Sequence, residues 1–136
     1  MYRKILIGGI VIAIVAVIGV LLLNTERKGL AIGVNQFMQH PLLDDVFKGI
    51  KDEFDESGFS KGNRVNIILK NANGDQNVAV QINKQFVAQK VDMIIALGTP
   101  SAQSACSVTK TIPIIFGAIT DPVMAGIADS LEKPGG

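Results

Sequence analysis

The stretch that decides the fold reads Val91-Asp92-Met93-Ile94-Ile95-Ala96-Leu97-Gly98-Thr99-Pro100-Ser101-Ala102. Its first part is short, apolar and without alternation, which is typical of a strand buried on both faces of a parallel sheet. Gly98 permits a tight exit from that strand, Thr99 suits a helix cap, and Pro100 suits the first helical position. The sequence therefore predicts a strand that passes directly into a helix.

The start of this expected helix offers a place for an anion. The first backbone N–H groups of a helix have no partner within it, and the helix dipole favours negative charge there. We expect Thr99 to cap the N–H of Ala102, which leaves the N–H and hydroxyl of Ser101 for a carboxylate. The alternative is an ordinary strand-to-helix junction that binds nothing.

Strand and helix patterns alternate along the rest of the chain. Further apolar runs predict strands at residues 29–34, 65–69 and 112–118. Helices are expected from Pro41 to Ser57-Gly58, from an Asp75 cap to about Lys90, and briefly after Pro122. This order predicts an α/β fold, a parallel sheet with helices on both faces and right-handed crossovers.

The first of these helices has two distinct faces. Apolar side chains recur at helical spacing, at Leu43, Val46, Phe47, Ile50 and Phe54. The acidic side chains fall mostly on the other side, and they are Asp44, Asp45, Asp52, Glu53, Asp55 and Glu56. Paired carboxylates serve acid–base chemistry in some enzymes, but on an amphipathic helix we interpret them as a solvated face.

Ligands of parallel α/β sheets bind beyond the carboxyl ends of the strands. The predicted binding edge comprises residues 35–40, 71–75, 98–102 and 119–122. Asp121 at this edge has two possible roles, which one residue can combine: it accepts hydrogen bonds from an ammonium group, or it caps the short helix after Pro122. A carboxylate site at the helix start near Ser101 and an ammonium site at Asp121 would together favour a zwitterion such as an amino acid. Gln36 would add an adaptable polar contact.

Composition excludes several other functions. The 136 residues carry 13 basic and 12 acidic side chains, so net charge gives no electrostatic reason to expect nucleic acid. One cysteine, Cys106, excludes an internal disulfide, and one histidine, His40, excludes the usual zinc cluster. We expect Cys106 to be a buried apolar group. His40 is expected to cap the helix at Pro41, with a ligand contact as the alternative.

No motif for catalysis or a cofactor is present in the sequence. It contains no dinucleotide-binding glycine pattern, no phosphate loop with Gly-Lys-Ser/Thr and no nucleophile elbow. We therefore predict a binding protein that is not an enzyme and uses no cofactor.

Residues 5–23 form an unbroken run of apolar residues and glycines, which raises the mean hydropathy to +0.36. As a helix the run spans roughly 28 Å, close to the ~30 Å hydrocarbon core of a bilayer. No cleavage site follows directly, and no cysteine is available for lipidation. We expect an uncleaved membrane anchor with a short linker over residues 1–28 and one domain over 29–136. Basic residues flank the run almost evenly, with a slight bias that places the domain outside.

An ordered set of motifs resembles a known family. The motifs are His40-Pro41-Leu42-Leu43-Asp44, Asn73-Gly74-Asp75, Gly98-Thr99-Pro100-Ser101-Ala102, Ile112-Pro113-Ile114-Ile115-Phe116, Thr120-Asp121-Pro122-Val123 and Pro134-Gly135-Gly136. Together they resemble the first, periplasmic-binding-protein-like lobe of the ABC-transporter substrate-binding proteins associated with tryptophan or tyrosine uptake.

This resemblance implies an extracytoplasmic receptor that delivers a small solute, an aromatic amino acid, to a membrane permease powered by a separate ATPase. It places the ligand contacts at Gln36, Thr99, Ser101 and Asp121, with Gly98 allowing close approach. Receptors of this family have two lobes, whereas this sequence stops at Gly136, so we expect a chain truncated to one lobe. The apparent anchor stands in place of a lipidated cysteine.

Two other functions are open to such a domain. One is an α/β ligand-sensing domain of a membrane signalling protein, which an effector region in the parent gene would favour. The other is a small flavodoxin-like or Rossmann-type enzyme, which the missing phosphate loop disfavours.

Overall fold

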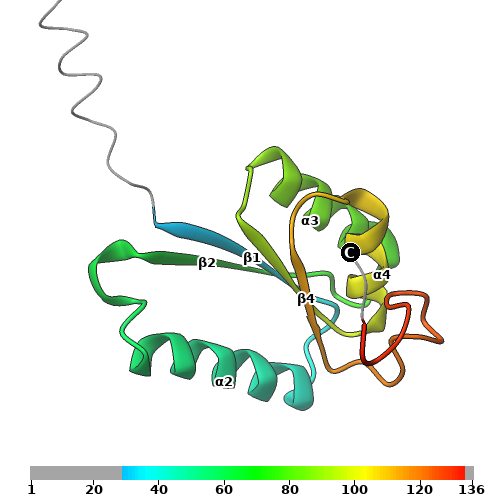
Figure 1. The fold of residues 1–136 in the computed structure, drawn as a ribbon, viewed down its shortest axis with the longest axis horizontal. Helices are drawn as coiled ribbons and strands as arrows, with labels where there is room; N and C mark the ends of the chain where they lie inside the picture. Colours follow the sequence, from blue (N-terminus) through cyan, green and yellow to red (C-terminus); the bar gives the residue numbers. More distant parts are fainter. Residues whose placement is uncertain (1–28, 134–136) are drawn as a thin grey trace, which may run out of the picture.

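The computed structural model describes residues 29–133, which form a sheet between two layers of helices (Figure 1). Along the chain the elements are β1 (Leu30–Gln36), α2 (Pro41–Glu56), the 3-10 helix η1 (Lys61–Asn63), β2 (Val65–Asn71), α3 (Gln76–Ala88), β3 (Met93–Leu97), α4 (Thr99–Val108) and β4 (Ile114–Gly117). The anchor expected over residues 5–23 lies outside the described residues. Within the described range, no helix has the length and apolar character needed to cross a bilayer.

All neighbouring strands are parallel, in the order β2-β1-β3-β4. At the carboxyl end of the sheet, Gln36 is level with Asn71 on one side and Leu97 on the other, and Leu97 is level with Gly117. Helix α2 covers one face, whereas α3 and α4 cover the other (Figure 1). The predicted α/β architecture is therefore confirmed for the described residues.

The two faces of the sheet have separate cores. On the α2 side, Val34 and Leu97 pack with Leu43 and its apolar neighbours along the helix. On the other side, Phe86 of α3 packs among small residues of the sheet and of α4. A side chain at Gly33 would begin 2.6 Å from the Phe86 ring, so the absence of a Cβ there permits this packing.

Several element boundaries differ from the prediction. Strand β1 continues through Gln36, because the ladder with both neighbouring strands reaches that residue. Strand β4 begins at Ile114, since the Thr109 hydroxyl holds the preceding residues in a turn. The helix expected after Pro122 is wrong: residues 122–126 form turns, and Gly126 in a left-handed conformation (φ 69°) ends them.

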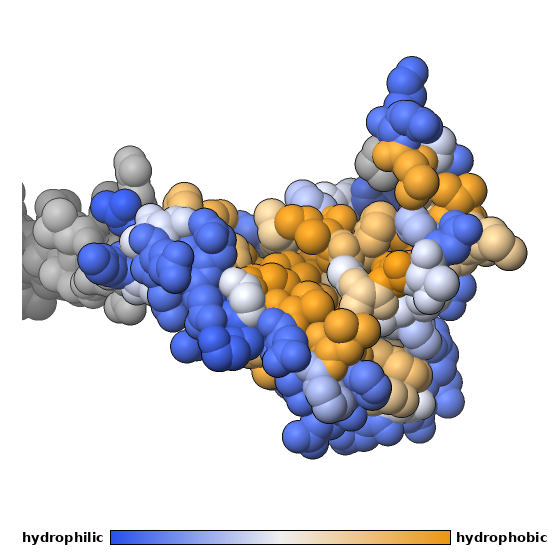
Figure 2. Space-filling view, turned by 90° about the horizontal axis from the view of Figure 1, so that it is seen from below, coloured by the Kyte–Doolittle hydropathy of each residue, from blue (hydrophilic) through white to orange (hydrophobic). Residues whose placement is uncertain are grey.

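Strand β4 is an edge of the sheet, and among the described strands it pairs only with β3. Ile115 on this strand is half exposed. Figure 2 shows the surface of the molecule that faces downward in Figure 1. Apolar side chains gather in the middle of that surface, and hydrophilic residues lie around them.

Replacing Gly33 with Val tests the packing of Phe86. Valine favours strands by propensity, but its Cβ collides with the ring, and overpacking of a core typically costs about 1–3 kcal/mol. We expect Gly33→Val to lower the free energy of unfolding by about 2 kcal/mol in urea titrations followed by circular dichroism.

The matched control is Gly49→Ala on α2, where an added Cβ meets nothing within 4 Å. Because alanine favours helix over glycine, this variant should gain up to about 1 kcal/mol. A Gly33→Val protein as stable as the wild type would contradict the described contact.

Candidate ligand-binding site

Backbone hydrogen bonds join the loops that leave the strands at the carboxyl edge. The N–H of Phe37 donates to the carbonyl of Leu97 at 3.0 Å, and the N–H of Ala72 donates to the carbonyl of Gln36 at 2.9 Å. The N–H of Gly98 donates to the carbonyl of Gly117 at 3.0 Å. The residue that follows each of the first three strands is thus fixed to a neighbouring strand, and these loops lie side by side.

The turn at Gly98 aims α4 at this edge. Gly98 has φ 96° and ψ 146°, a conformation that side chains rarely adopt, and a Cβ there would lie 3.2 Å from the Cβ of Phe37. Gly98 itself is the N-cap, without a side-chain cap, so the expected capping by Thr99 is wrong. The helix begins one residue earlier than predicted because only glycine makes this turn.

The first turn of α4 keeps backbone donors directed at the edge. The N–H of Ala102 donates to the carbonyl of Gly98 at 3.2 Å, which is the first bond of the helix. The N–H groups of Thr99 and Ser101 precede it and by position have no partner within the helix. Thr99 is half-buried, and its N–H and that of Ser101 are candidate donors to an anion.

The Ser101 side chain points into the protein. Ser101 is fully buried, and its hydroxyl donates to Oδ1 of Asn35 at 3.2 Å. We expected both the hydroxyl and the N–H to be available to a ligand; the hydroxyl instead bonds to β1. The hydroxyl is therefore not free for a ligand; the backbone N–H is the remaining candidate donor, and the residue as a whole has no exposed surface.

A buried polar network continues behind α4. Asn35 donates to the carbonyl of Ala79 at 3.0 Å, and Asn83 donates to the hydroxyl of Ser104 at 2.7 Å. The Ser104 hydroxyl in turn donates to the carbonyl of Ser101 at 2.8 Å. Among the described residues, Oδ1 of Asn83 is the one buried side-chain nitrogen or oxygen without a hydrogen bond. The network ties the start of α4 to β1 and α3.

Sequence reasoning missed this network, although a signal was present. Asn83 lies among Ala79, Ile82 and Phe86 on the buried face of α3, where a polar side chain needs a partner. Asn35 was expected at the binding edge, just beyond a strand that ends at residue 34, and it is a buried residue of β1.

Gln36 ends β1 at the same edge and is only 3% exposed. Its Nε2 donates to Oδ1 of Asp44, in the first turn of α2, at 2.6 Å. His40 caps that helix by accepting the N–H of Leu42 at Nδ1, so the predicted capping role is confirmed. Asp44 is exposed, as expected of the solvated face, and it also accepts this hydrogen bond from Gln36.

The remaining acidic face of α2 is solvated, as expected. Lys48 pairs with Asp52 and Lys51 with Asp55, four residues apart on the exposed helix surface. The hydrogen bond to Asp52, followed by the charge of Asp52, raises the pKa of Lys48. This face takes no part in the site.

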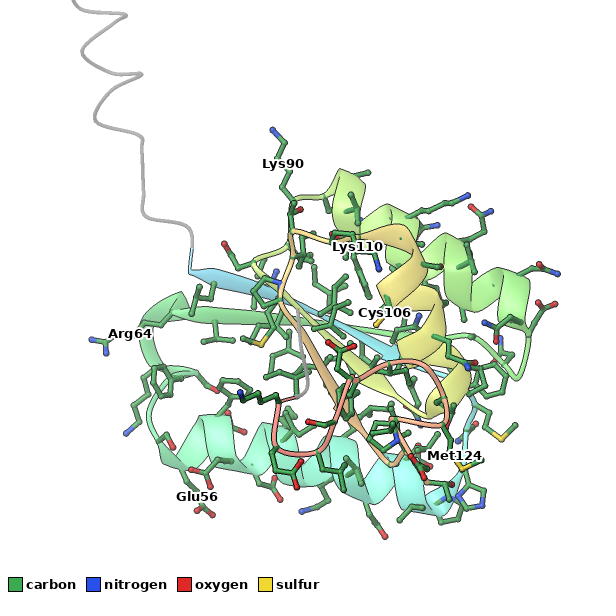
Figure 3. The ribbon with its side chains drawn as sticks, turned by 45° about the vertical axis from the view of Figure 1, so that its right-hand side comes forward. Glu56, Arg64, Lys90, Cys106, Lys110 and Met124 are labelled. Atoms are coloured by element: carbon green, nitrogen blue, oxygen red, sulfur yellow. The ribbon has the colours of Figure 1, made fainter. Side chains whose placement is uncertain are left out.

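Asp121 lies in the loop after β4, four residues beyond Gly117, and is exposed. Its Oδ1 accepts the N–H of Val123 at 3.0 Å and of Met124 at 2.9 Å, so the expected capping role is confirmed, for a turn rather than a helix. Figure 3 shows Met124 on this loop, away from Lys90 and Lys110 at the other end of the sheet. The contact of Asp121 with an ammonium group stays a prediction.

Cys106 and the possible metal-ligating residues add nothing to the candidate site. Cys106 on α4 is partly buried rather than fully buried. In residues 29–133, no three histidine, cysteine or acidic side chains group closely enough to hold a metal ion. The structure thus places Gln36, Gly98, Thr99 and Ser101 at the carboxyl edge of the sheet, with the Gln36 side chain on the α2 face and the Ser101 side chain on the opposite face. Asp121 lies on a separate loop that follows β4.

Residues 31–136 match the family model described as ABC transporter substrate binding protein. The chain belongs to this family. It is 44% identical over 111 residues to a tyrosine-binding protein of Clostridioides difficile (strain R20291), a match that covers 82% of this chain and 32% of that protein. The predicted family resemblance is confirmed.

Solved structures agree with this assignment. An ABC domain from Streptococcus pneumoniae in complex with L-Trp is 44% identical with a TM-score of 0.75, and the match covers 79% of this chain and 36% of that one. A ligand-free, open substrate-binding protein with adhesive properties from Clostridium difficile is 40% identical with a TM-score of 0.75, covering 78% and 36%. The present chain therefore spans about a third of the length of each of these relatives.

Replacing Gly98 with Ala tests the turn that aims α4. The substitution forces a side chain into a conformation that costs on the order of 1–3 kcal/mol, and its Cβ presses on Phe37. We expect a loss of stability of that size, with faster hydrogen exchange in the first turn of α4. The control is Gly62→Asn, since the left-handed conformation there (φ 72°, ψ 31°) suits asparagine. Equal stability of Gly98→Ala and the wild type would contradict the described turn.

Proposed function

We propose that this chain is part of an extracytoplasmic receptor of an ABC importer that binds an aromatic amino acid and delivers it to a permease. The proposal is supported by the family, by a relative named for tyrosine and by a related structure with L-Trp. The chemistry of the carboxyl edge of the sheet agrees with such a ligand.

The observation that carries the proposal is the start of α4 at that edge. Gly98 turns the chain so that the unpartnered N–H groups of Thr99 and Ser101 lead the helix, and no side chain caps them. A carboxylate accepts hydrogen bonds from these donors and is stabilised by the helix dipole. The ligand carboxylate is therefore assigned to this turn.

We assign the ammonium group of the ligand to Asp121. Because Oδ1 of this carboxylate holds its own loop, Oδ2 is the oxygen that accepts from the ligand. A charge-assisted hydrogen bond of this kind is about twice as strong as a neutral one. A carboxylate site and an ammonium site together select zwitterions.

The remaining parts of the importer are proposed from the family and the sequence. Residues 5–23 would hold the receptor at the cell membrane with its domain outside the cytoplasm. There it would supply ligand to the membrane permease, which a separate ATPase powers. This arrangement keeps receptor and permease within reach of each other.

Titration of the full chain, isotope-labelled and held in mild detergent, tests the proposal by NMR. L-Trp or L-Tyr should shift the amide resonances of Thr99 and Ser101 in a saturable way, because these N–H groups bind the carboxylate. Saturable shifts confined to other regions, or no saturation with any of the twenty amino acids, would overturn it.

Asp121→Asn tests the ammonium contact separately. The amide oxygen still caps Val123 and Met124, so the loop is kept while the charge is lost. We expect about tenfold weaker binding of L-Trp. The matched control is Asp129→Asn, another exposed aspartate after β4, which should bind as the wild type does. Equal affinities of the two variants would argue against an ammonium contact at Asp121.

A further inference from the structure

Gln36 and Asp44 form a hydrogen bond that is separate from the groups assigned to the ligand carboxylate and ammonium. Their hydrogen bond is short at 2.6 Å and partly buried, and Gln36 is only 3% exposed. It joins the last residue of β1 to the first turn of α2, at the edge where the ligand is assigned.

This contact fixes which way the Gln36 amide faces. An ionised carboxylate is only an acceptor, so the group that faces Asp44 must be the amide nitrogen. The amide oxygen, Oε1, then points away from Asp44. Without such a partner, a glutamine amide turns over easily and presents either its donor or its acceptor.

Oε1 of Gln36 is free to accept a hydrogen bond from a ligand. No described residue donates a hydrogen bond to it, and it is not among the buried atoms that lack a partner. It therefore retains contact with solvent. Gln36 is level with Leu97, and a Cβ at Gly98 would lie 3.9 Å from Leu43 of α2, so the end of β1, the start of α2 and the turn at Gly98 lie together at this edge.

We propose that Asp44 is a positioning residue that holds the Gln36 amide with its oxygen toward the ligand, as an acceptor for the ligand ammonium group. The inference rests on the proposed function and adds a determinant of specificity. A fixed acceptor favours ligands that carry a donor next to the carboxylate, whereas an amide free to turn over accepts either kind.

The test compares Asp44→Asn with Asp45→Asn, the same change one position along the exposed surface of α2. Two probes are titrated into the full chain: L-Trp, and indole-3-propionate, which keeps the ring and carboxylate but lacks the ammonium group. Asp44→Asn should weaken L-Trp binding about tenfold and leave indole-3-propionate within twofold. Asp45→Asn should change neither.

The outcomes separate positioning from a structural role. If Asp44→Asn weakens the binding of both probes equally, Asp44 has only a structural role, and the proposal is overturned. Unchanged binding of L-Trp would also overturn it. If the wild type binds neither probe, the proposed function fails and the ligand role of Gln36 fails with it.

A second readout tests the contact without a ligand. The side-chain NH2 resonances of Gln36 should be distinct and slow to exchange in the wild type and in Asp45→Asn. In Asp44→Asn they should move and exchange faster. Unchanged Gln36 resonances in Asp44→Asn would overturn the proposed orientation.

Discussion

The hydrogen bond between the Ser101 hydroxyl and Asn35 is the contact on which the site depends. Both side chains are fully buried, and a buried polar group without a partner costs about 1–3 kcal/mol. Helix α4 therefore has one favourable position against β1, and rotation or sliding would break this bond and those of Asn83 and Ser104. A helix start held in this way can present its backbone donors at a fixed place.

The carboxyl edge adds a second constraint. Parallel strands end level with one another, so the loops must turn sharply to avoid collision. Gly98 makes such a turn beside Phe37, and His40 and Asp75 cap the helices that follow their strands. The same geometry that stabilises the fold gathers polar groups at one end.

The two faces of the sheet are stabilised differently. On the α2 side, large aliphatic side chains of the sheet pack against an amphipathic helix whose other face is charged. On the opposite side, Gly33 and alanines let α3 and α4 approach closely around Phe86. Close approach puts Asn83 within reach of Ser104, which explains how buried polar groups find partners there.

Much of the fold was predictable from local pattern. Apolar runs, the caps at His40 and Asp75 and the glycine after Leu97 are properties of neighbouring residues, so the order of elements and the parallel sheet followed from the sequence. The errors occurred where local signals compete with the ladder or with turns: Asn35 and Gln36 joined β1, Thr99 entered the helix, and Pro122 began turns instead of a helix.

The sequence by itself determined the elements, the family and the polar residues near the edge of the sheet. Only the tertiary structure decided how those side chains point. It turned the Ser101 hydroxyl inward to Asn35 and brought Asp44 to Gln36, contacts that join residues 66 and 8 positions apart. Such pairings depend on how helices pack on the sheet, and no local pattern encodes the direction of a side chain toward a distant partner.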